Sequence, residues 1–120
     1  MDARQPLYRM KAEFFKTLGH PVRIRVLELL AERERAVSEM LAEVGIEPAN
    51  LSQQLAVLRR AGLVASRREG LSVLYTLSSP EVAELLATAR RILTGVVSDQ
   101  ASWLDTADPI PAAAGTRRRR

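Results

Sequence analysis

The stretch of sequence that most constrains the fold runs from residue 37 to residue 76. Residues 39–44 carry apolar side chains at helical spacing, the run Gly45-Ile46-Glu47-Pro48 follows, and a second helical pattern starts at Pro48. Glycine supplies a permissive backbone for a sharp turn, and proline is tolerated at the first position of a helix. Two helices joined by a short glycine-containing turn predict a helix-turn-helix unit. We expect Ser38 to cap the first of these helices.

The second helix of this unit has an apolar side and a polar side. Leu51, Leu55 and Leu58 recur at helical spacing and are predicted to face the core. The side chains around them near the helix start are Asn50, Ser52, Gln53 and Gln54, and the last turn carries Arg59 and Arg60. Amides and hydroxyls can both donate to and accept from base edges in a DNA major groove, whereas arginines suit phosphates. This helix is therefore predicted to contact DNA.

A β-hairpin is predicted directly after Gly62, where the helix ends. Residues 63–68 and 71–77 show the alternation of strands, and Glu69-Gly70 lies between them. Arg67 and Arg68 on the first strand would lie beside the DNA backbone and minor groove.

Positive charge is local in this chain. It has eighteen Lys and Arg and fourteen Asp and Glu, but four of the arginines form the run Arg117–Arg120. Without that run, acids and bases are equal in number. Between residues 50 and 79, four arginines stand against the single acid Glu69. Such a local cluster is typical of a DNA-contacting face.

Two separate motifs resemble the ArsR/SmtB winged-helix repressors. One is similar to the family's recognition helix and consists of Leu51-Ser52-Gln53-Gln54-Leu55, Leu58-Arg59 and Ala61-Gly62-Leu63-Val64. The other is similar to its second-helix signature and consists of Leu18-Gly19-His20-Pro21, Arg23, Val26-Leu27 and Leu29-Leu30. The resemblance covers residues 12–98. It implies a mainly α winged helix-turn-helix with a small β-hairpin wing, which dimerises through its first and last helices and represses by occluding a promoter.

The first and last helices carry apolar stripes. The first helix is predicted over 7–18, ending at a left-handed Gly19, and the last over 81–104. The stripe on the last helix is too long for so small a domain to cover, which favours a partner helix. With the resemblance, the candidate dimer contacts are Met10, Phe14, Leu85, Ala89, Leu93, Val96 and Trp103. A stripe that covers only its own domain stays open as the alternative.

We expect one domain over 7–104, a flexible lead over 1–6 and a disordered tail over 105–120. The arginine run that ends the tail either reaches DNA phosphates or is simply solvated. Residues 32–35 are interpreted as a solvated turn, followed by a short strand at Ala36-Val37. No apolar run approaches 18 residues and no secretory signal opens the chain, so a cytoplasmic location without membrane contact is expected.

The family is best known for metal sensing, and here the sequence departs from it. The chain has no cysteine for a thiolate site, and the last helix offers Glu81, Glu84 and Asp99 but no histidine. The one histidine, His20, is predicted to cap a helix or form a hydrogen bond. No metal site and no cofactor are expected, although a weak site built from carboxylates alone stays open.

The sequence therefore favours a homodimeric, sequence-specific transcriptional regulator that binds an inverted repeat in double-stranded DNA. The alternative is a winged-helix module that binds other proteins without specific DNA contact. An enzyme is rejected, because one histidine, no cysteine and no glycine-rich phosphate loop leave nothing to carry catalysis. An unidentified small-molecule effector stays open.

Overall fold

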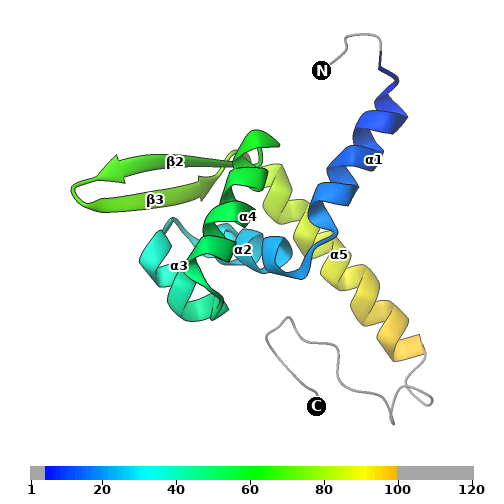
Figure 1. The fold of residues 1–120 in the computed structure, drawn as a ribbon. Helices are drawn as coiled ribbons and strands as arrows, with labels where there is room; N and C mark the ends of the chain where they lie inside the picture. Colours follow the sequence, from blue (N-terminus) through cyan, green and yellow to red (C-terminus); the bar gives the residue numbers. More distant parts are fainter. Residues whose placement is uncertain (1–4, 100–120) are drawn as a thin grey trace.

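The computed structural model describes residues 5–99, which form five helices and three strands (Figure 1). In chain order these are α1 (Leu7–Leu18), α2 (Pro21–Glu32), β1 (Arg35–Ala36), α3 (Val37–Val44), α4 (Pro48–Arg60), β2 (Val64–Glu69), β3 (Ser72–Leu77) and α5 (Pro80–Asp99). Most of the predicted lead, the whole predicted tail at 105–120 and Trp103 lie outside the described residues.

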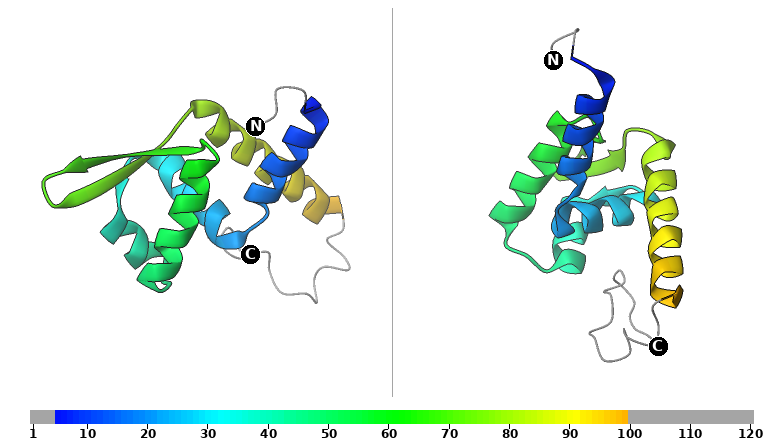
Figure 2. Two further views of the ribbon diagram at one scale, coloured as in Figure 1. Left: turned by 45° about the horizontal axis from the view of Figure 1, so that its top comes forward. Right: turned by 90° about the vertical axis from the view of Figure 1, so that its right-hand side faces the viewer.

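Helix α2 occupies the centre of the fold. The right-hand view of Figure 2 shows it between α4 on one side and α5 on the other. The largest fully buried side chains come from α2, α3 and α4 and are Val26, Leu27, Leu29, Met40, Leu51 and Leu58. None of these six is aromatic, as expected for a chain with only 4% aromatic residues.

The predicted helix-turn-helix is confirmed. Helix α3 ends at Gly45, whose φ of 71° is a left-handed conformation that glycine adopts without strain. The chain then becomes extended at Glu47, and Pro48 is the first residue of α4. Gly62, with φ of 79°, turns the chain out of α4 and into β2. Gly45 and Pro48 therefore bound the turn between α3 and α4.

The predicted wing is also confirmed. Strands β2 and β3 pair antiparallel from Val64 opposite Leu77 to Glu69 opposite Ser72, and the hairpin extends away from the helices (Figure 1). Gly70 lies in the turn with φ of 62°, and the next residue, Leu71, is fully exposed. Strand β1 pairs with the other side of β3, which gives the order β1-β3-β2 in the sheet formed by residues 5–99. Strand β1 comprises Arg35-Ala36 and so begins one residue earlier than predicted.

The prediction of a solvated turn at residues 32–35 is wrong for Arg35. This residue is 3% exposed, because its pairing with Tyr75 of β3 directs the side chain into the protein. Its guanidinium donates from Nη2 to Glu32 Oε1 at 2.5 Å and from Nη1 to Glu43 Oε2 at 2.6 Å. These two ion pairs join α2, β1 and α3.

Two predicted helix ends also differ from the structure. Helix α3 starts at Val37, so Ser38 is not its N-cap. Instead, the side chain of Glu39 accepts a hydrogen bond from the Ala36 N–H at 2.9 Å. Gly19 has φ of −79° and ψ of 48°, which is not left-handed. The His20 N–H donates to the Leu18 carbonyl at 2.8 Å, so the chain turns through a tight γ-turn that leads directly into α2.

Candidate nucleic-acid interface

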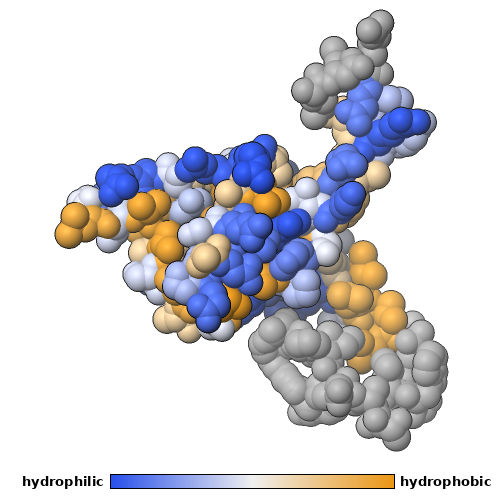
Figure 3. All heavy atoms as spheres, viewed as in Figure 1, coloured by the Kyte–Doolittle hydropathy of each residue, from blue (hydrophilic) through white to orange (hydrophobic). Residues whose placement is uncertain are grey.

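Helix α4 presents a polar face to solvent and an apolar face to the core. Leu51, Leu55 and Leu58 are buried, whereas Ser52 and Gln53 are exposed. In the view of Figure 3, hydrophilic residues gather along one edge of the wing and continue over the end of α4. Buried leucines hold this helix against α2 while its other side remains available to a partner.

Gln54, which the sequence predicted to read bases or to position the start of the helix, is buried. It is 7% exposed, and both ends of its amide are bonded within the protein. Its Oε1 accepts from Arg23 Nε at 2.8 Å, and its Nε2 donates to Asn50 Oδ1 at 2.9 Å. A side chain held in this way is not available to contact a base. The sequence showed no sign of this bond, because Arg23 lies 31 residues away on α2.

The four predicted arginines have different surroundings. Arg60 and Arg68 are exposed and form no ion pair with any residue from 5 to 99. Arg59 is exposed as well, and its Nη1 donates to Ser66 Oγ at 3.0 Å, which links the end of α4 to the wing. The guanidiniums of Arg60 and Arg68 are therefore the ones most available to an anionic partner.

Arg67 is bound by a carboxylate that the sequence did not suggest as its partner. Its Nε and Nη2 donate to the two carboxylate oxygens of Glu34, both at 2.9 Å, and Glu69 lies 3.6 Å from Nη2. The hydrogen bond from Arg67 lowers the pKa of the Glu34 carboxyl below its usual value and raises the pKa of Arg67 itself. Both groups therefore stay charged, and the pair ties the wing to the segment after α2.

Exposed apolar side chains gather on α1 and α5. They are Leu7, Tyr8, Phe15, Ile92, Leu93 and Val96. Figure 3 shows the part of this surface on α5 as a patch of hydrophobic residues. Among the predicted dimer contacts, Met10, Phe14 and Leu85 are half-buried, whereas Ala89, Leu93 and Val96 are exposed. The exposed residues that were not among the predicted dimer contacts are Leu7, Tyr8, Phe15 and Ile92.

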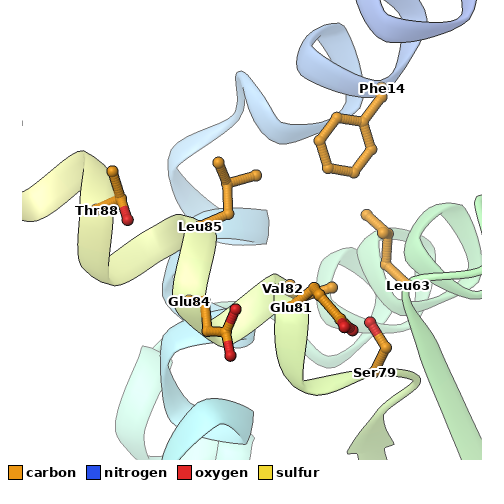
Figure 4. Close-up of a pocket in the computed structure, with 8 residues that line it drawn as sticks. All are labelled: Phe14, Leu63, Ser79, Glu81, Val82, Glu84, Leu85 and Thr88. Carbon is orange, nitrogen blue, oxygen red and sulfur yellow. The ribbon is translucent and has the colours of Figure 1, made fainter.

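A hollow separates α1 from the first turns of α5. Figure 4 shows the side chains that line it, which are Phe14, Leu63, Ser79, Glu81, Val82, Glu84, Leu85 and Thr88. Phe14 and Leu85 lie on opposite sides of it and belong to the two helices that carry the exposed apolar surface.

His20 acts as the helix cap that the sequence predicted. Its Nδ1 accepts a hydrogen bond from the Val22 N–H at 3.2 Å at the start of α2. Across residues 5–99, no three His, Asp or Glu side chains lie close enough together to hold a metal ion. None of the helices within this range has the length and apolar character needed to cross a membrane.

A polar-faced helix that follows a short turn and is flanked by a basic hairpin defines a winged helix-turn-helix protein. The profile described as "bacterial regulatory protein, arsR family" matches residues 20–66. A relative that is 59% identical over 102 residues covers 84% of this chain. The chain therefore belongs to the arsR family of bacterial regulatory proteins.

That relative is the HTH-type transcriptional regulator Rv0081 of Mycobacterium tuberculosis strain H37Rv, of which the match covers 90%. The crystal structure of Rv0081 is 60% identical to this chain, covers 81% of it and 98% of its own chain, and gives a TM-score of 0.76. The biofilm growth-associated repressor of Xylella fastidiosa strain 9a5c is 41% identical over 75 residues, 62% of this chain and 66% of the repressor.

A third similar protein has been solved as a dimer. It is the homodimeric winged helix-turn-helix DNA-binding domain of Mb0332 from Mycobacterium bovis, determined by solution NMR. This domain is 33% identical to the chain, covers 83% of it and 92% of its own chain, and gives a TM-score of 0.62.

Proposed function

We propose that the protein is a sequence-specific DNA-binding transcriptional regulator that acts as a homodimer on an inverted repeat. The observation that carries this proposal is the exposed polar face of α4 beside a basic wing. Ser52 and Gln53 are exposed and take no part in packing, because Leu51, Gln54, Leu55 and Leu58 form the buried side of the helix. Membership of the arsR family supports the same conclusion.

The proposed contacts follow the surroundings of each side chain. Asn50, Ser52 and Gln53 read bases from the first turns of α4. The buried Gln54 holds the Asn50 side chain in place through a hydrogen bond. Arg60 and Arg68 bind phosphates, because their guanidiniums have no partner among the described residues. Arg59 and Arg67 contribute less direct contact, since each already bonds to another part of the protein.

A homodimer accounts for the apolar surface of α1 and α5. Large exposed side chains on two helices favour burial against a second copy. Mb0332, which is similar over 83% of this chain, is homodimeric. Two-fold symmetry would place the two α4 helices in successive major grooves about 34 Å apart, which matches an inverted repeat.

Repression by occluding a promoter is the proposed mode of action, and the similar Xylella protein is a repressor by name. A protein that acts on DNA would work in the cytoplasm, and no catalytic activity is proposed for it. The hollow between α1 and α5 is the proposed place for an effector, since a ligand there would contact both dimer helices.

The first experiment is a titration of the protein against its own promoter region and against random DNA at two salt concentrations. A regulator binds its promoter more tightly, with an affinity that falls steeply with salt. Equal weak binding to both DNAs would instead favour a module that binds proteins. A reporter placed behind the promoter then separates repression from activation, and added transition metals test for metal-dependent release.

The dimer is tested by Leu93→Asp, with Thr94→Asp as the control. Both residues are exposed on α5, but only Leu93 belongs to the apolar surface. Sedimentation equilibrium should show a monomer for Leu93→Asp and a dimer for Thr94→Asp and the unmodified protein. A monomeric unmodified protein would contradict the proposed assembly.

A further inference from the structure

A row of hydrogen bonds runs from the end of α1, through α2, to the start of α4. Arg23 on α2 donates from Nη1 to the Thr17 carbonyl at 3.1 Å and from Nε to Gln54 Oε1 at 2.8 Å. Gln54 then donates from Nε2 to Asn50 Oδ1 at 2.9 Å. The row therefore ends on a residue proposed to read bases.

The chemistry of the row allows only one orientation of each amide. A guanidinium has hydrogen-bond donors and no acceptor, so the group that faces Arg23 must be the oxygen of Gln54. The nitrogen of Gln54 consequently faces Asn50, and the oxygen of Asn50 must accept it. Such orientations are often ambiguous for amides, but here the arginine settles them. Reversal would place the Nε2 donor of Gln54 against the Nε donor of Arg23 and leave both unpaired, which is costly at 7% exposure.

One group of Asn50 remains available for a partner. Its Nδ2 donates to no acceptor within residues 5–99, whereas Oδ1 is held by Gln54. Asn50 is half-buried on α4, three residues before the exposed Gln53, so it lies at the border of the polar face.

We infer that Asn50 recognises DNA as a hydrogen-bond donor and that Arg23 and Gln54 are the positioning residues that impose this. The inference rests on the proposed function. An amide N–H₂ group matches acceptors on the major-groove edge, such as purine N7, guanine O6 or thymine O4. It does not match the donor groups, N4 of cytosine and N6 of adenine.

The test is Gln54→Glu, which keeps the acceptor for Arg23 but removes the donor for Asn50. The Asn50 amide then turns so that Nδ2 donates to the new carboxylate and Oδ1 faces outward. Because the added charge weakens binding to any DNA, the informative quantity is the ratio of Kd values among operators that differ at one base pair. At one position in each half-site, preference should move by about two- to ten-fold towards base pairs that place a donor, adenine N6 or cytosine N4, where Asn50 makes its contact.

Two further variants separate this effect from general damage to the helix. Gln54→Met keeps similar volume and makes neither bond, so the preference at that position should fade without reversing. In the Asn50→Ala background, Gln54→Glu should no longer move the preference at all, because the reading group is absent. An unchanged preference in Gln54→Glu, or a shift that survives in Asn50→Ala, would overturn the inference.

A measurement on the free protein distinguishes failure of this inference from failure of the proposed function. The Asn50 side-chain N–H₂ signals in a ¹⁵N–¹H spectrum are identified by their loss in Asn50→Ala. Gln54→Glu should move one of them downfield, as a new hydrogen bond forms; an unmoved pair would refute the orientation. If that shift occurs but the unmodified protein shows no DNA preference, the proposed function fails while the amide orientation stands.

Discussion

Replacing the buried Arg35 tests whether its ion pairs or its packing stabilise the fold. The side chain is 4% exposed, but its partners Glu32 and Glu43 remain 66% and 43% exposed. Carboxylates that keep contact with water lose little when their partner is removed, about 0.2–1 kcal/mol for each pair. Arg35→Ala also removes a long buried side chain, and comparable truncations cost about 2–5 kcal/mol. We expect Arg35→Ala to lose about 3 kcal/mol of unfolding free energy, mostly through packing.

Arg35→Met is the informative comparison. Methionine fills most of the same space and removes Nε, a buried nitrogen that has no hydrogen-bond partner among the described residues. An unpaired buried polar group costs about 1–3 kcal/mol, so its removal offsets the loss of the two ion pairs. The Arg35→Met protein should therefore lie within about 1 kcal/mol of the unmodified protein.

Urea unfolding followed by circular dichroism gives both values, with all proteins compared at one concentration because a dimer is involved. In a thermal scan, Arg35→Ala should lower Tm by about 10–20 °C, since 1 kcal/mol corresponds to several degrees in a domain of this size. If Arg35→Met proves as unstable as Arg35→Ala, the ion pairs with Glu32 and Glu43 dominate, and the packing argument is refuted.

Three further predictions concern single side chains. Gln53→Ala should weaken operator binding by about 1–3 kcal/mol and relax specificity, whereas equal losses on operator and random DNA would exclude base contact. Arg68→Ala should flatten the slope of log K against log salt by about one unit, and Arg67→Ala by less, because a carboxylate already holds Arg67. The hydrogen bond from Arg33 lowers the pKa of Glu39 from 4.5 to about 2. The charged Glu39 carboxylate therefore contributes its full stabilisation above pH 4.5, and this stabilisation is lost as the pH falls towards 2. Thermal scans across this window should show a weaker pH dependence for Glu39→Gln, and an identical dependence would contradict the assignment.

The parts of the fold that the sequence predicted correctly depend on local backbone chemistry. Gly45, Gly62 and Gly70 all have positive φ, and Pro48 begins α4, as expected from residues within a few positions of each other. The apolar spacing of α4 likewise identified its buried leucines. Periodicity and turn residues were enough to place the helix-turn-helix and the wing, because neither feature depends on distant parts of the chain.

The sequence was least informative where distant residues determine the surroundings of a side chain. Gln54 is one of several adjacent polar residues, and only the arginine 31 positions earlier explains why it is buried. Arg67 was expected to be available to DNA, but it bonds to Glu34, which lies 33 positions away in the sequence. Arg35 is buried because β1 pairs with β3. No local pattern separates such residues from solvated neighbours of the same type.

These distant contacts also connect the two proposed surfaces. A dimer fixes the spacing of its two recognition helices only if each α4 is held firmly relative to the dimer helices. The buried leucines prevent α4 from leaving the core, but apolar contacts have little directional preference. Arg23 adds direction, because it bonds to the last turn of α1 through the Thr17 carbonyl and to α4 through Gln54. Arg23 therefore links the last turn of α1 directly to the start of α4.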